Sequence, residues 1–185
     1  MDDIVKQALA KWPNVPDCYG WLGLDARGNW YMRDDRVQAA GPFAAVGGAS
    51  GAASKGSLLK HDKLVDFIQR NYESDADGQW FFQNGPQRVY VELEATPMIW
   101  RVDGAPGFAV TAHTGQAARV QRCVVDEHGR VYLETDAGFG LVHTLDMMHA
   151  ADAVEQGLWV PGEVPAHDLP ARFGYVRSPQ SLQKS

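Results

Sequence analysis

Apolar side chains recur at helical spacing in three stretches of the chain. The first covers residues 4–12, the second follows Ser57 up to Tyr72, and the third covers residues 145–154. Charged side chains occupy the rest of the second stretch, which is typical of an amphipathic helix packed on a core. Its apolar face is formed by Leu64, Phe67, Ile68 and Tyr72. The pattern therefore predicts three helices.

Strand-like patterning dominates the rest of the chain up to residue 134. Alternating apolar and polar positions and clustered aromatic or β-branched residues favour strands over helices there. The expected strands are Trp21–Leu24, Asn29–Arg33, Trp80–Gln83, Arg88–Glu94, Met98–Val102, Phe108–Ala112, Val120–Val125 and Arg130–Glu134. The first two flank a short turn and should form a hairpin.

One turn motif occurs three times, with an Asp at its first position, a Gly at its fourth, and an apolar pair after one more residue. The three copies are Asp25-Ala-Arg-Gly28, Asp75-Ala-Asp-Gly78 and Asp126-Glu-His-Gly129. Asp and Gly at these positions suit a type I turn followed by a left-handed glycine that begins a new strand. The spacing of the glycines, roughly 50 residues, raises the question of an internal repeat, which the sequence leaves open.

Two segments lack regular patterning. Residues 41–56 are rich in Gly, Ala and Ser and offer few large side chains to offset the cost of ordering the backbone, so we expect a mobile loop. Prolines at positions 161, 165 and 170 predict irregular chain after Trp159, and the residues from Ser178 onward are expected to be a frayed tail.

Together these elements predict the α+β class, with a bent antiparallel sheet in split β-barrel-like halves packed by a few helices. We expect an N-terminal helix and lead-in over residues 1–20 and an α+β domain over residues 21–160. The domain should consist of two related halves, at about 21–95 and 96–160. Residues 161–185 should form a proline-rich irregular arm and tail.

Several segments, taken in order, resemble a known family. A tryptophan-bearing hairpin is followed by Gly56-Ser-Leu-Leu59, Leu64-Val-Asp-Phe67, Asp77-Gly-Gln-Trp-Phe-Phe82, Arg88-Val-Tyr-Val-Glu-Leu93 and Asp103-Gly-Ala-Pro-Gly-Phe-Ala-Val110. Over roughly residues 21–160 this order is similar to an uncharacterised proteobacterial family of unknown function with the DUF1285-type fold and repeated structural motifs. The resemblance implies an α+β fold with two related halves and a ligand-binding or signalling role. It supplies no established catalytic residues.

Composition and charge limit the expected cellular compartment and binding partners. The net charge of -6, with scattered Lys and Arg, argues against a nucleic-acid partner. The acidic start of the chain does not resemble a secretory signal, and no apolar stretch approaches membrane-spanning length, so no membrane partner is expected. Cys18 and Cys123 are isolated from each other in sequence, and whether they are close in space is left open. A cytoplasmic protein is the expectation.

The second hairpin carries the main candidate binding site. Strand alternation places Phe81, Arg88, Tyr90 and Glu92 on one face of the sheet and Trp80, Phe82, Val89, Val91 and Leu93 on the other. Aromatic rings with a few convergent polar groups are what small-ligand sites prefer. The alternative is a half-exposed sheet face with cross-strand pairs such as Phe81 with Tyr90, which the commonness of one-sided antiparallel sheets favours.

Other chemistry has weaker sequence support. Glu92 and Glu94 lie on one face about 7 Å apart, as carboxylate pairs in hydrolases do, but such spacing is common on exposed strands. Lys60 and His61 precede a helix start that could face an anion or simply be capped. His143 and His149 lack a firm metal-binding spacing and are expected to make hydrogen bonds.

The sequence therefore favours a non-catalytic module that binds a small molecule or a protein and needs no cofactor. One alternative is an interaction adaptor that uses residues 41–56 and the C-terminal arm to dock a partner or a second copy of the chain as a homodimer. Another is a hydrolase or transferase that uses Glu92, Glu94 and a histidine.

Overall fold

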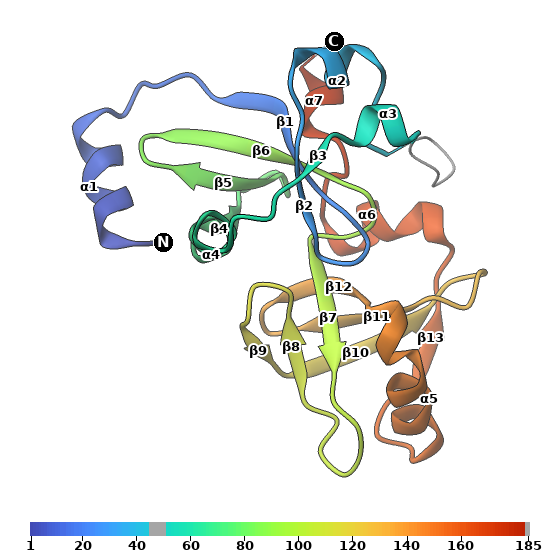
Figure 1. Cartoon of the computed structure of the whole chain (residues 1–185). Helices are drawn as coiled ribbons and strands as arrows, with labels where there is room; N and C mark the ends of the chain where they lie inside the picture. Colours follow the sequence, from blue (N-terminus) through green and yellow to red (C-terminus); the bar gives the residue numbers. More distant parts are fainter. Residues whose placement is uncertain (45–50, 184–185) are drawn as a thin grey trace. The chain divides into compact units, whose positions relative to one another are not determined.

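The computed structural model describes residues 1–44 and 51–183, which form two compact units. Unit 1 contains Met1–Asp25, Asn29–Glu94 and Tyr175–Ser185. Unit 2 contains Ala26–Gly28 and Ala95–Gly174. Each unit has a curled β-sheet with helices, which confirms the α+β class (Figure 1). Within the described ranges, no helix has the length and apolar character needed to cross a membrane.

Unit 1 is built on a six-stranded sheet of order β3-β2-β1-β6-β5-β4. Its strands are β1 (Cys18–Leu24), β2 (Trp30–Met32), β3 (Ser57–Leu58), β4 (Tyr72–Ser74), β5 (Trp80–Asn84) and β6 (Gln87–Leu93). Its helices are α1 (Asp3–Lys11), α2 (Asp35–Ala39), α3 (Ala52–Lys55), α4 (Asp62–Arg70) and α7 (Pro179–Leu182). The predicted helices at residues 4–12 and before Tyr72 are thus confirmed as α1 and α4.

Unit 2 is built on a seven-stranded sheet of order β13-β10-β11-β12-β7-β8-β9. Its strands are β7 (Met98–Val102), β8 (Val110–Ala112), β9 (Ala117–Ala118), β10 (Val120–Val125), β11 (Val131–Thr135), β12 (Gly138–Val142) and β13 (Pro161–Glu163). Its helices are α5 (Met147–Glu155) and α6 (Leu169–Phe173), preceded by the 3-10 turns η1 (Thr144–Asp146) and η2 (Ala166–Asp168). The predicted third helix is confirmed as α5.

The two sheets have the same connectivity. In unit 1, two antiparallel three-stranded meanders, β1 to β3 and β4 to β6, are joined by parallel pairing of β1 with β6. In unit 2, the meanders β7 to β9 and β10 to β12 are joined by parallel pairing of β7 with β12, and β13 adds to β10 in parallel. The sequence pattern indicated antiparallel strands alone, because pairing between strands far apart in sequence leaves no local signal.

The three Asp-x-x-Gly motifs adopt the expected turn. Gly28, Gly78 and Gly129 have φ values of 83°, 77° and 74°, in the left-handed region. In each motif the Asp side chain accepts a hydrogen bond from the backbone N–H four residues later, at 2.8 to 3.0 Å. The turns connect β1 to β2, β4 to β5 and β10 to β11. Local chemistry therefore determines where these three hairpins begin.

The sheet of unit 1 is covered on both faces. Helix α4 packs on β5 through Phe67 and Phe82, whose ring centroids are 5.5 Å apart. On β6, Val89 pairs with Phe82, whereas Glu92 points to the opposite face because strand side chains alternate. Helix α7 lies on that opposite face, where the N–H of Gln180 donates to Glu92 at 2.9 Å. The half-exposed face expected from the sequence is instead buried at Phe81, Gln83, Tyr90 and Glu92.

The two segments expected to be irregular contain regular structure where they are described. Residues 45–50 of the expected mobile loop lie outside the described residues, but residues 52–55 form α3. After Trp159, the chain forms β13, α6 and α7. Prolines occur at the start of β13 and in the first turns of α6 and α7, positions that do not require a proline N–H.

A buried arginine connects several segments of unit 1. The side chain of Arg33 donates from Nε to the carbonyl of Ser54 at 3.0 Å, from Nη1 to Gly20 at 3.0 Å and from Nη2 to Gly41 at 2.7 Å. Arg33 is 0% exposed. Burial lowers the pKa of the guanidinium, and the charge of nearby Glu92 opposes that change. The guanidinium thus donates hydrogen bonds to three backbone carbonyl groups that lie in separate segments of unit 1.

We expect Arg33→Met to lower the free energy of unfolding by about 3 kcal/mol, because three carbonyl groups and Glu92 would stay buried without their cation. Urea unfolding measures the change. Arg36→Met is the matched control, since Arg36 is exposed on α2. The control should change stability by less than about 0.5 kcal/mol. Equal losses in the two variants would contradict the role assigned to Arg33.

A second prediction isolates the left-handed glycine of the turn motif. Gly129 and Gly107 both face open space, but only Gly129 has a left-handed φ. Gly129→Ala should therefore cost about 1 kcal/mol of unfolding free energy, whereas Gly107→Ala should cost almost nothing. Thermal unfolding of both variants against the original chain tests this. If Gly129→Ala were as stable as Gly107→Ala, the turn would not need its glycine.

Candidate functional site

Three of the four side chains proposed from the second hairpin, Phe81, Arg88 and Tyr90, come together. Phe81 lies opposite Tyr90 across β5 and β6, with ring centroids 5.7 Å apart. The guanidinium of Arg88 lies 4.6 Å from the Phe81 ring centroid, and the Tyr90 hydroxyl donates to Asp75 at 3.1 Å. Tyr19 stacks on Tyr90 at 4.6 Å. These contacts bury Phe81 and Tyr90 and leave Arg88 and Tyr19 half-buried.

Glu92 and Glu94 contact different partners. Glu92 accepts hydrogen bonds from the Ser178 hydroxyl at 2.5 Å and from the Gln180 N–H at 2.9 Å. Glu94 pairs with the Lys55 ammonium at 2.9 Å. Both carboxylates therefore connect distant segments of unit 1. These are the carboxylates that the hydrolase alternative would use, and here they make structural contacts.

Two of the positions that sequence analysis linked to anions or metals, His61 and His143, serve as helix caps, whereas His149 lies within α5. The Nδ1 atom of His61 accepts from the Leu64 N–H at 3.3 Å at the start of α4, and Lys60 precedes it on the surface. The Nδ1 atom of His143 accepts from the Leu145 N–H at 3.1 Å, the kind of hydrogen bond expected of it. Within residues 1–44 and 51–183, no three His, Cys, Asp or Glu side chains gather in a way that could hold a metal ion.

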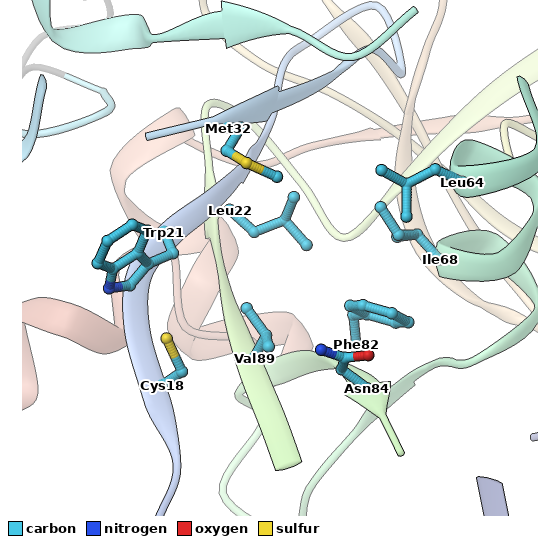
Figure 2. A pocket seen from close by; sticks show the side chains of 9 residues that line it. All are labelled: Cys18, Trp21, Leu22, Met32, Leu64, Ile68, Phe82, Asn84 and Val89. Carbon is cyan, nitrogen blue, oxygen red and sulfur yellow. The ribbon is translucent and has the colours of Figure 1, made fainter. Parts of the chain in front are cut away.

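An open hollow of about 240 Å³ lies on the opposite face of the unit 1 sheet from Glu92 (Figure 2). It is bounded by strands β1, β2, β5 and β6 and by helix α4. Its lining consists almost entirely of alkyl, aryl and sulfur groups. The residues that form it are Cys18, Trp21, Leu22, Met32, Leu64, Ile68, Phe82, Asn84 and Val89.

Ordinary periodicity brings the walls of the hollow together. Leu22, Phe82 and Val89 come from three strands, and Phe82 and Val89 are direct cross-strand partners. Leu64 and Ile68 are four residues apart on α4 and so share one face of that helix. Figure 2 shows Leu22 and Val89 across the hollow from Leu64 and Ile68. Sequence analysis placed Phe82 and Val89 on the core face of the sheet and Leu64 and Ile68 on the apolar face of the helix, and the structure adds that the core is not closed there.

A bulge in β1 shapes one side of the hollow. Between Cys18 and Leu22, β1 has three residues opposite a single residue of β6. Gly20, inside this stretch, has a left-handed φ of 82°. Bulges bend a strand and change the direction of neighbouring side chains. As a result the consecutive residues Trp21 and Leu22 both line the hollow.

The lining is nearly without charge. Cys18 is its titratable member, and burial raises the pKa of that thiol, so the group is neutral at physiological pH. Asn84 contributes a polar but uncharged carboxamide. Trp21 and Met32 remain 40% and 46% exposed at the rim. This arrangement can hold an apolar molecule, and it offers no charged group for acid-base chemistry.

Comparison with known proteins places the chain in a family. Residues 1–180 match the family described as "Protein of unknown function (DUF2946)", and the chain belongs to that family. Among solved structures, the chain is similar to a DUF1285 family protein from Silicibacter pomeroyi DSS-3. That pair has 14% sequence identity and a TM-score of 0.48, over 82% of this chain and 84% of the other. Membership of a family of unknown function, as the sequence predicted, is thus confirmed. A search of curated proteins found no match.

The Tyr90 network predicts a loss of stability at alkaline pH. Burial raises the pKa of Tyr90 to about 12; the hydrogen bond with Arg88 opposes the rise and the one with Asp75 adds to it. An unfolded tyrosine has a pKa of about 10, so the stabilisation is complete below about pH 10 and is lost as the pH rises towards 12.

Unfolding free energies of the original chain and of Tyr90→Phe between about pH 9 and 12 test this expectation. The original chain should lose stability more steeply. At neutral pH the variant should be about 1 kcal/mol less stable, because it lacks the hydrogen bond to Asp75. Parallel pH curves would show that Tyr90 titrates as it does in the unfolded chain.

Proposed function

We propose that this member of the DUF2946 family is a binding module, and that unit 1 takes a small apolar molecule in the hollow between β1 and α4. The observation that carries the proposal is the open hollow of about 240 Å³ with its almost wholly apolar lining. Such a surface gains free energy when a ligand replaces water, by about 25 cal/mol per Å² of apolar area buried.

The size of the hollow suits a compact ligand. An apolar cavity of about 150 Å³ is large enough to bind benzene, whereas sites for drug-sized ligands occupy about 300–1,000 Å³. The hollow, at about 240 Å³, lies between these values. One ring with a short substituent therefore fits.

The lining favours binding over catalysis. A general acid or base must lie within hydrogen-bond reach of the proton it transfers and have a pKa near the working pH. The thiol of Cys18 has a raised pKa, and the carboxamide of Asn84 does not titrate. Carboxylates such as Glu92 and Glu94 are bound to Ser178 and Lys55 in unit 1. A non-catalytic role is the function that these groups support best.

Binding of propylbenzene to the full chain, followed by ¹H–¹⁵N NMR, tests the proposal. We expect saturable shifts at Trp21 and along α4, and Leu64→Phe should weaken binding at least about tenfold because the larger ring occupies the hollow. Leu145→Phe makes the same change at an exposed site in unit 2 and should leave binding unchanged. The proposal fails if propylbenzene does not bind, or if both variants bind it as the original chain does.

A further inference from the structure

We infer that the ligand of the hollow is an uncharged molecule with a compact apolar body and one polar group that hydrogen-bonds to Asn84. The inference rests on the proposed function and narrows its ligand class. It follows from three features of the described residues: the charge of the lining, the position of Asn84 and the space available.

The lining disfavours a charged ligand. Apart from Asn84 and the neutral thiol of Cys18, the residues around the hollow present hydrocarbon or thioether groups, with the indole of Trp21 at the rim. A carboxylate or an ammonium group that entered would lose hydration without gaining a partner of opposite charge. A neutral ligand does not incur this cost.

Asn84 supplies the polar end of the hollow. In Figure 2 it lies below Phe82, at the opposite end from Met32. Its position is fixed by backbone pairing with Gln87 across a two-residue turn, in which Gly85 has a φ of 56°. The carboxamide offers both a donor and an acceptor. A hydroxyl or amide on the ligand could therefore hydrogen-bond to Asn84 either as donor or as acceptor.

Four probes of similar size separate the possibilities in NMR titrations of the full chain. They are propylbenzene, 2-phenylethanol, phenylacetate and 2-phenylethylamine, which share a ring and differ in the end group. We expect 2-phenylethanol to bind at least about tenfold more tightly than either charged probe, because the charged groups lose hydration.

Substitution of Asn84 tests the polar contact. Asn84→Leu should weaken 2-phenylethanol about fivefold, the loss of one hydrogen bond, and should leave propylbenzene binding as tight or tighter. Asn14→Leu, at an exposed position outside the hollow, is the matched control and should alter neither affinity. Propylbenzene binding also reports that the Asn84 variant is folded.

The outcomes distinguish the inference from the proposed function. If neither propylbenzene nor 2-phenylethanol binds, the proposed function fails and the inference fails with it. If propylbenzene binds but a charged probe equals or exceeds 2-phenylethanol, the hollow still binds apolar molecules and the inference is overturned. The same conclusion follows if Asn84→Leu weakens both neutral probes equally or weakens neither.

Discussion

The buried guanidinium of Arg33 is the interaction on which unit 1 depends most. It hydrogen-bonds to Gly20 in the bulge of β1, to Gly41 after α2 and to Ser54 in α3. A guanidinium is suited to this task because its rigid fork can donate in several directions at once. The acidic neighbour Glu92 partly compensates the cost of burying the charge. The Arg33 side chain therefore supplies hydrogen bonds to three carbonyl groups, a task that neighbouring strands perform in a regular sheet.

Gly20 connects the Arg33 hydrogen bonds to the hollow. The carbonyl of Gly20 receives the Arg33 hydrogen bond, and its left-handed φ allows the bulge that brings Trp21 and Leu22 to the same wall. A Cβ at this position would meet the ends of the flexible Gln38 and Gln180 side chains, which can move aside, so it is the left-handed φ that requires glycine here. The hydrogen bond from Arg33 thus holds the bulged segment of β1 that forms one wall of the candidate site.

Local patterns were sufficient to predict much of this fold. The three Asp-x-x-Gly turns, helix α4 and the pairing of Phe81 with Tyr90 each depend on residues close in sequence or on strand alternation. The burial of Glu92 was not predictable, because its partners Ser178 and Gln180 are 86 and 88 residues away. The hollow was missed for a similar reason. Its residues have the apolar patterning of ordinary core positions. Only the distance between α4 and the sheet decides whether their side chains pack against each other or leave a hollow.

The C-terminal segment packs on one face of the unit 1 sheet, through contacts of α7 with β6 and β1. The Leu93 N–H donates to the carbonyl of Arg177 at 2.8 Å, and the Gln180 side chain donates to Gln38 at 2.9 Å beside the bulge. This segment therefore supports β1 from the face opposite the hollow, although it follows the whole of unit 2 in sequence. The Gln180 side chain of α7 lies against Gly20, next to the wall formed by Trp21 and Leu22. The contact with α7 and the wall of the hollow thus meet at the same bulge of β1.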